Sequence, residues 1–182
     1  MELLAPAGSR QALTAAVQSG ADAVYLGGPQ FGARYSAENF TIEEMKTWVD
    51  YCHLYGVDVH VTVNTLVKEK EIESFKEYLK QLNKIGVDAL IVQDMGAVEI
   101  IKKTVPDMTL HASTQMTVTS LEGVKYLEDM GFSRVVLARE LSEKEIEHIC
   151  KNAKAEIEVF VHGAICMCYS GQCLMSSILG GR

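Results

Sequence analysis

The stretch "VDVHVTVN", Val57–Asn64, decides the fold class of this chain. Successive side chains of a β-strand point to opposite faces, and here the two faces differ in chemistry. One face carries only valine, at Val59, Val61 and Val63. The other face is polar, with His60, Thr62 and Asn64. If helices cover the valine face, the polar face points into an enclosed interior, which is typical of a (β/α) barrel.

The joints on either side of this strand predict strict alternation of helices and strands. The pattern Gly-X-Asp opens Gly20–Ala23, Gly56–Val59 and Gly86–Ala89, and Gly131–Arg134 is a degenerate fourth copy. Glycine ends a helix in the left-handed conformation, and aspartate favours the turn into the following strand. Capping-box spacing marks two helix starts, at Thr41 with Glu44 and at Ser142 with Glu145.

These signals divide the chain into seven strands and six helices. The strands are expected near Glu2–Ala5, Ala23–Gly27, Asp58–Asn64, Ala89–Gln93, Thr109–Ser113, Arg134–Ala138 and Ile157–His162. The helices are expected near Ser9–Ser19, Ile42–Tyr55, Glu69–Ile85, Gly96–Thr104, Leu121–Met130 and Glu143–Ala153. Such alternation indicates a parallel sheet, either open and doubly wound or closed into a barrel. The first strand is not followed by Gly-x-Gly-x-x-Gly, so a dinucleotide-binding open sheet has no support. Polar residues within the predicted strands favour the barrel. We therefore predict an α/β fold of the TIM-barrel type, incomplete at about seven βα units.

The composition and net charge exclude some classes of protein. The 182 residues are 48% hydrophobic and 23% charged, with a formal net charge of −7. This acidic balance argues against a protein that coats duplex nucleic acid. The sequence has neither a long apolar run nor a secretory signal pattern, and we expect a cytoplasmic protein without a membrane partner. Five cysteines, an odd number, do not indicate a secreted disulfide framework.

Barrels place their chemistry at the C-terminal ends of their strands, where this chain has polar residues. The predicted catalytic residues are His111, Arg139, Glu158 and His162, and Asn64 and Gln115 are predicted to bind substrate. Histidines, carboxylates and one arginine at one rim suit an anionic small molecule and proton transfer. The long loop "FGARYSAENF", Phe31–Phe40, follows the second strand and adds Arg34, Glu38 and Asn39 as candidate substrate contacts.

Several blocks of the sequence resemble one family along essentially the whole chain. They are "ELLAPAG" (2–8), "GADAVYLGG" (20–28), "FGARYSAENF" (31–40), "HASTQM" (111–116), "VVLAREL" (135–141) and "EVFVHGAICMCYSGQC" (158–173). The family is that of the collagenase-like peptidases, U32, which includes RNA-hydroxylating enzymes and oxygen-independent ubiquinone hydroxylases. The resemblance implies a 4Fe-4S cluster bound by four cysteines at the top of an incomplete or variant barrel.

The resemblance also implies roles for individual cysteines. Cys166 and Cys173 match the first two cluster cysteines, whereas Cys168 lies outside the ligand pattern and is interpreted as an ordinary thiol. The other two ligands would lie beyond Arg182, so residues 1–182 are expected to be the N-terminal barrel domain of a longer protein. We expect no cluster to bind this chain alone. A homodimer, or the chain's own tail, is expected to cover the gap left by the missing strand.

Three functions remain open on the sequence. The first is hydroxylation of a base in tRNA or rRNA, with oxygen from a small anionic donor such as prephenate and Arg139 holding its carboxylate. The second is a peptidase: the metalloprotease and serine-elbow motifs are absent, but Cys166 or Cys173 paired with His162 would suit a cysteine protease. The third is a module that only docks RNA or a protein.

Overall fold

A computed structural model describes residues 1–33, 39–163, 166–175 and 178. It contains one parallel sheet whose seven strands follow chain order. The strands are β1 (Leu4–Pro6), β2 (Ala23–Gly27), β3 (Asp58–Val63), β4 (Ala89–Val92), β5 (Thr109–Ala112), β6 (Arg134–Val136) and β7 (Glu156–Glu158). The helices are α1 (Arg10–Gln18), α2 (Ile42–Leu54), α3 (Ile72–Ile85), α4 (Met95–Thr104), α5 (Leu121–Asp129) and α6 (Glu143–Asn152). Two short 3-10 helices, η1 (Glu69–Glu71) and η2 (Thr114–Met116), complete the order.

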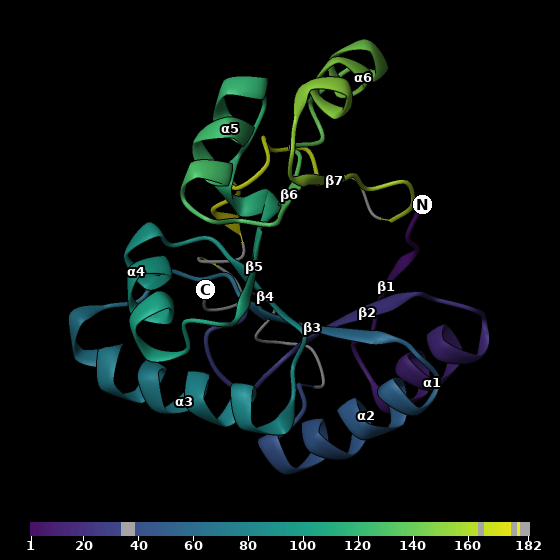
Figure 1. The fold of residues 1–182 in the computed structure, drawn as a ribbon, viewed down its shortest axis with the longest axis vertical. Helices are drawn as coiled ribbons and strands as arrows, with labels where there is room; N and C mark the ends of the chain where they lie inside the picture. The colour runs from purple at the N-terminus through teal and green to yellow at the C-terminus, as the bar shows by residue number, and fades with distance from the viewer. Residues whose placement is uncertain (34–38, 164–165, 176–177, 179–182) are drawn as a thin grey trace.

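The sheet curls into an incomplete barrel with its helices on the outer face. Figure 1 shows the helices surrounding an open ring, with the N-terminus in the opening between β7 and β1. The prediction of an incomplete TIM-type barrel is confirmed, and the described residues contain no eighth strand. Because parallel neighbours need a helical crossover, chain-order pairing of consecutive strands places every helix on the same face of the sheet.

The local signals explain where the elements start and end. All four joint glycines have φ between 71° and 86°, a region that costs other residues energy. Asp88, in the joint before β4, accepts a hydrogen bond from the amide of Val59 at 2.7 Å and so ties two neighbouring strands together. Both predicted capping boxes form, at Thr41 before α2 and at Ser142 before α6.

The core lies between the sheet and its helices. Val59, Val61 and Val63 of β3 are fully buried there, together with Phe75 and Leu79 of α3. The opposite face of β3 points inward, as predicted, and its His60 lies against His111 of β5. Those strands are not neighbours, so this contact is made across the concave side of the sheet.

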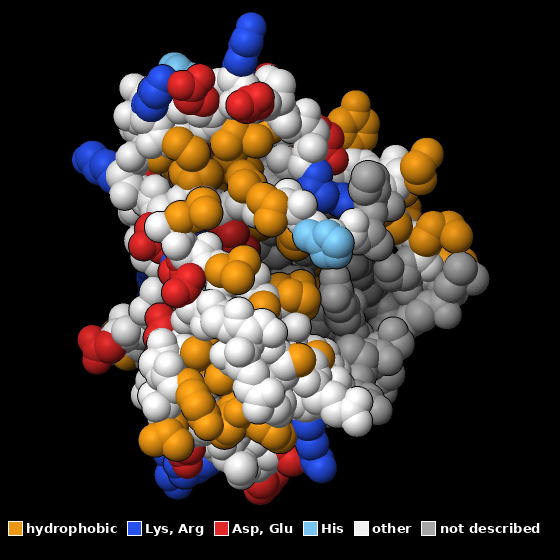
Figure 2. Space-filling view, turned by 90° about the vertical axis from the view of Figure 1, so that its right-hand side faces the viewer, with side chains coloured by type: hydrophobic (Ala, Val, Ile, Leu, Met, Phe, Trp, Pro, Cys, Tyr) orange, Lys and Arg blue, Asp and Glu red, His pale blue; other side chains and the backbone are white. Residues whose placement is uncertain are grey.

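The last strand departs from its prediction. β7 ends at Glu158, whereas the apolar run predicts a strand as far as His162. β7 pairs only with β6, so residues past Glu158 have no second partner to hold them in a ladder. Val159, Phe160 and Val161 are consequently exposed, and Figure 2, which faces the open side of the ring, shows hydrophobic side chains at this surface. In the described part of the chain, no helix has the length and apolar character needed to span a membrane.

Candidate functional site

A loop with three cysteines is fixed to the rim at the C-terminal ends of β5 and β6. We call residues Cys166–Cys173 the cysteine loop. Its anchor is Ser170, which is 1% exposed. The amide of Ser170 donates to Glu140 Oε1 at 2.8 Å, and its carbonyl accepts from Thr117 Oγ1 at 2.7 Å. Glu140 follows β6 and Thr117 follows η2, so the loop is held on the face where barrels carry their active sites.

Two further contacts bring this loop close to the barrel. The backbone amide and Nε of Arg139 donate to Ser170 Oγ at 3.2 and 3.3 Å. Gly171 has φ 74°, and a Cβ at this position would lie 2.3 Å from the carbonyl oxygen of Gln115. The backbone of the loop therefore packs directly on η2, without a side chain between them.

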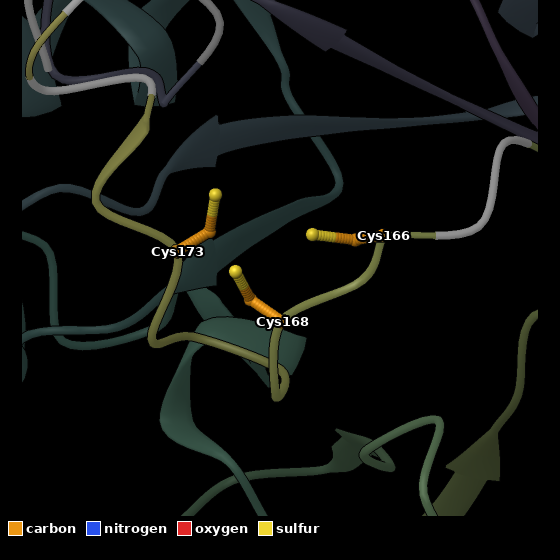
Figure 3. Close-up of side chains that lie close together, drawn as sticks. All are labelled: Cys166, Cys168 and Cys173. Carbon is orange, nitrogen blue, oxygen red and sulfur yellow. The ribbon is translucent and has the colours of Figure 1, made fainter.

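The three thiols of the loop point toward a common space, as Figure 3 shows. The sulfurs of Cys166, Cys168 and Cys173 all lie within 4.8 Å of one another. Cys166 and Cys173, the two predicted cluster ligands, are thus close together. The interpretation of Cys168 as an ordinary thiol outside the ligand set is not supported by the geometry, because the turn through Ser170 and Gly171 brings Cys173 back beside it. Among the described residues, this sulfur group contains no histidine.

Neighbouring groups set the charge state of these thiols. The backbone amide of Cys168 and, next, the side chain of Arg139 hydrogen-bond Cys166 and lower the pKa of its thiol. A hydrogen bond with the Cys173 side chain and, next, the charge of Cys173 raise the pKa of the Cys168 thiol. Soft thiolates with a nearby cation are suitable donors for iron–sulfur clusters and for thiophilic metal ions. The donor type therefore fits the cluster that the resemblance implies, with three donors in the described residues.

A pair of buried histidines lies inside the barrel. His60 and His111 are 3% and 4% exposed, and their ring centroids are 4.6 Å apart in an edge-to-face arrangement. Burial lowers the pKa of both rings, that of His111 to about 3, and the positive charge of nearby Arg134 acts in the same direction on each. Both rings are thus neutral at ordinary pH. The structure gives no hydrogen-bond partner to either Nδ1 atom.

One arginine connects the two open edges of the barrel. Arg134, at the start of β6, donates from both Nη atoms to the two carboxylate oxygens of Glu2 at 2.6 Å. It also donates from Nε to Glu156 at 2.8 Å. Glu2 precedes β1 and Glu156 begins β7, so this ion-pair group spans the gap where an eighth strand would lie. We call Arg134, Glu2 and Glu156 the Arg134 clamp.

Glu158 lies beside this clamp with its charge poorly compensated. Arg134 Nη1 approaches Glu158 at 3.7 Å, and Glu158 Oε2 is buried without a hydrogen bond. Burial raises the pKa of Glu158 to about 7, although Arg134 acts in the opposite direction. A carboxyl group that changes charge near neutral pH is suited to proton transfer.

The other predicted site residues have different surroundings. Asn64 is held by neighbours: its Oδ1 accepts from the amide of Ala33 at 3.0 Å, and its Nδ2 donates to Ser113 Oγ at 3.3 Å. Asn39 lines a cleft of about 500 Å³ beside the start of α1. The predicted strand to His162 would have placed this side chain on the inward face with Glu158, but β7 ends at Glu158 and His162 is exposed. Arg34 and Glu38 lie outside the described residues.

Comparison with known families gives a match over nearly all of the chain. The model of peptidase family U32 matches residues 8–182. The chain belongs to peptidase family U32. The sequence resemblance is thereby confirmed.

Several curated relatives of this U32 chain have names that refer to RNA, and others are named as a protease or a collagenase. This chain is 44% identical over its whole length to the 23S rRNA 5-hydroxycytidine C2501 synthase of Escherichia coli, and covers 27% of that protein. It is 40% identical to tRNA hydroxylation protein P1 of Bacillus subtilis, all of the chain matching 43% of that protein. The chain thus spans less than half of either relative. Among solved structures, that of a U32 peptidase superposes with a TM-score of 0.74 at 21% identity, covering 92% of this chain and 71% of the other.

Sequence reasoning missed Arg134 and the pairing of His60 with His111 in this U32 domain. The sequence offered one signal, because Arg134 opens an otherwise apolar strand. The register that places it level with His111 is known only from the structure. Residues paired across parallel strands share a face, so an inward His111 implies an inward Arg134. Without the strand register, Arg139 was the more obvious arginine.

Titration of Glu158 makes a pH-dependent contribution to stability. Its folded pKa, about 7, lies above the ordinary glutamate value of 4.5, so folding favours the protonated form. That contribution is complete below pH 4.5 and is lost as pH rises through 7. We expect the wild type to lose about 2 kcal/mol relative to Glu158→Gln between pH 5 and 8, measured by urea unfolding.

The same experiment separates Glu158 from the histidines. His111 has a depressed pKa and acts in the opposite direction, because its contribution is lost as pH falls below 6.5. His111 is present in both the wild type and Glu158→Gln, so its contribution cancels when their unfolding free energies are subtracted. A difference in unfolding free energy that does not change between pH 5 and 8 would show that Glu158 is ionised throughout.

Proposed function

We propose that this chain is part of an enzyme that hydroxylates a base of tRNA or rRNA. The observation that carries the proposal is the thiol group on the barrel rim of a domain that has several curated relatives named for RNA hydroxylation. The chain covers only part of those relatives, so substrate binding also involves residues outside it in this proposal. Its net charge of −7 is consistent with a basic RNA-binding surface lying elsewhere in the protein.

In this proposal Cys166 and Cys173 bind a 4Fe-4S cluster on the rim. When bound, the cluster supplies single electrons. Conversion of a base C–H to C–OH is a two-electron oxidation, so a donor that gives up oxygen is itself reduced. A small anionic donor such as prephenate fits, and Arg139 would hold its carboxylate beside the cysteine loop. Arg139 is exposed overall, and its Nε is already oriented by Ser170.

In this proposal the interior residues His111 and Glu158 would form hydrogen bonds with the substrate or donor and exchange protons with it. His111 is neutral, so it accepts or donates a hydrogen bond without adding charge to the pocket. Glu158 carries a proton up to about pH 7 and is the group in the described interior best suited to exchange one with substrate or donor. Asn64 would act indirectly, because its amide holds the loop at Ala33 in place over the rim.

The peptidase alternative has less support. A cysteine protease would need a histidine beside the thiolate, and none belongs to the sulfur group in the described residues. His162, the histidine that the sequence offered for this role, is exposed beyond β7.

The proposal is tested by RNA analysis in cells. The full-length protein is expressed in a strain that lacks its own U32 genes, and nucleosides from purified tRNA and rRNA are quantified separately by mass spectrometry. We expect a hydroxylated nucleoside in one RNA class, lost with Cys166→Ser and kept with Cys150→Ser. Cys150 is an exposed cysteine of α6, so it controls for loss of a thiol as such. Unchanged hydroxylation in Cys166→Ser would contradict the cluster role. Absence of any new nucleoside, with cleavage of casein by the same protein, would favour the peptidase.

A further inference from the structure

We propose that Glu2 keeps the interior acid Glu158 protonated by occupying Arg134, so that the segment before β1 sets the charge state of a group on the last strand. The inference rests on the proposed function, in which Glu158 exchanges a proton with the substrate or the donor. Arg134 makes two hydrogen bonds of 2.6 Å to Glu2 and lies 3.7 Å from Glu158. The carboxylate that holds the guanidinium is therefore the one that is ionised.

The hydrogen-bonding capacity of Arg134 is almost completely used. A guanidinium has five N–H groups. Four of them donate to Glu2 and Glu156, at distances of 2.5 to 2.8 Å. Within the residues that the structure describes, the fifth, on Nη1, has no acceptor at hydrogen-bonding distance, and Glu158 Oε2, buried without a partner, lies 3.7 Å from that nitrogen. A short movement would join these two groups, but the paired hydrogen bonds to Glu2 oppose it.

The charges around Arg134 also favour a neutral Glu158. The Arg134 side chain is 10% exposed, so water screens these charges incompletely. Its single positive charge is shared by the carboxylates of Glu2 and Glu156, and an ionised Glu158 would add a third negative charge beside it. After burial, which is the largest cause, the charges of these two carboxylates raise the pKa of Glu158 against the opposing effect of Arg134.

Backbone contacts fix Glu2 in this position. The amide of Leu3 donates to Asp22 Oδ2 at 2.7 Å, and the amide of Asp22 donates to the carbonyl of Leu3 at 3.0 Å. β1 then pairs with β2 along its length. The hydrogen bond from Arg134 lowers the pKa of Glu2, so its carboxylate is ionised at neutral pH. Glu2 is therefore a positioning residue, which acts on Glu158 through Arg134.

The other titratable groups around Glu158 do not substitute for Glu2. Glu156 precedes it by two residues on the same face of β7, but its side chain is 66% exposed, against 34% for Glu2, so water screens it more. His60 of β3 and His111 of β5 share the interior. Both rings are neutral at ordinary pH, because burial lowers their pKa, and they add no charge.

The inference is tested by NMR of the isotope-labelled 182-residue chain, following the carboxyl carbon of Glu158 as pH is varied. Loss of the signal in Glu158→Gln assigns it. We expect the wild type to titrate near pH 7, and Glu2→Gln to raise the acid dissociation constant of Glu158 by about tenfold or more, because Arg134 then donates to its carboxylate. Glu2→Asp keeps the charge and should retain most of the wild-type behaviour. Glu147→Gln removes an exposed carboxylate of α6 and should change nothing.

A second comparison separates action through Arg134 from direct repulsion between the two carboxylates. In Arg134→Met the titration of Glu158 should move to higher pH, and adding Glu2→Gln should then change the dissociation constant by less than about threefold. An equal effect of Glu2→Gln with and without the arginine would overturn the inference. If circular dichroism shows that Arg134→Met does not fold, the comparison of Glu2→Asp with Glu2→Gln decides, because only a charged side chain holds the guanidinium.

Two further results would overturn the inference. One is an unchanged titration in Glu2→Gln. The other is a wild type in which Glu158 titrates near the ordinary glutamate value of 4.5, since nothing would then keep it protonated. The titration needs neither RNA nor a cluster, so failure of hydroxylation leaves its result standing, and failure here leaves RNA hydroxylation untouched.

Discussion

Replacing Gly171 with alanine is expected to detach the cysteine loop from the barrel rim. The added Cβ would lie 2.3 Å from Gln115 O and 2.6 Å from Thr117 Oγ1, and the first of these atoms is backbone that cannot rotate away. The left-handed φ of 74° adds a cost of about 1–2 kcal/mol for a residue with a Cβ. Both the steric contact and the backbone strain are relieved when the cysteine loop detaches from the rim, so the substitution favours the detached loop.

Chymotrypsin cleavage after Tyr169, an exposed residue of the loop, measures this opening. Cleavage of the native chain should accelerate about tenfold or more, since about 1.4 kcal/mol of local opening is a factor of ten. The midpoint of urea unfolding should change much less.

Gly20→Ala is the matched control for the backbone strain. Gly20 has φ 86°, but a Cβ added there would meet no atom within 4 Å, and it lies in the joint between α1 and β2. We expect this substitution to lower global stability by about 1–2 kcal/mol without affecting cleavage after Tyr169. If Gly171→Ala is cleaved no faster than Gly20→Ala, the loop is not held by the close contact with η2.

Replacing Arg134 with methionine is expected to be the most destabilising single change in the clamp. Arg134 has a side chain that is 10% exposed, and its loss leaves the carboxylates of Glu2 and Glu156 facing each other. Breaking a largely buried ion pair from one side costs about 3–5 kcal/mol, and the partial exposure of both glutamates places the expected loss near the lower figure. Urea unfolding at pH 7 measures it.

The pH dependence of that loss identifies its origin. The hydrogen bond from Arg134 lowers the pKa of Glu2, so the stabilisation is present above pH 4.5 and is lost as pH falls through the folded pKa. The gap between wild type and Arg134→Met should therefore narrow below pH 4.5. A cavity effect alone would be independent of pH.

An exposed ion pair provides the comparison. Lys151 and Glu147 of α6 form a pair in which both side chains are more than half exposed. Lys151→Met should change stability by less than about 0.5 kcal/mol, because solvent screens such pairs. If Arg134→Met costs no more than Lys151→Met, the clamp does not stabilise the open barrel.

Much of the fold was predictable because its signals are local. The capping boxes at Thr41 and Ser142 act over three residues, and each joint glycine acts on its own backbone. The alternation of valine with polar residues in β3 depends only on strand geometry. Local signals of this kind do not depend on which strands pair.

The candidate site was predicted less completely. The positions of His111 and Glu158 in the interior follow from strand alternation. His162 was misplaced because alternation was extended beyond the point where β7 loses its ladder. Cys168 was set aside because sequence spacing does not show that the turn through Ser170 brings its sulfur back toward Cys173.

The sequence by itself determined the βα alternation, the inward polar face of β3, the family, and the gathering of thiols in one short segment. Tertiary structure alone decided which charges meet. Arg134 and Glu2 are 132 positions apart, and His60 and His111 lie on strands that do not pair. Such contacts depend on the curl of the whole sheet, which brings its first and last strands together around the interior. No short stretch of sequence contains that curvature, because it arises from the summed twist and packing of all seven strands.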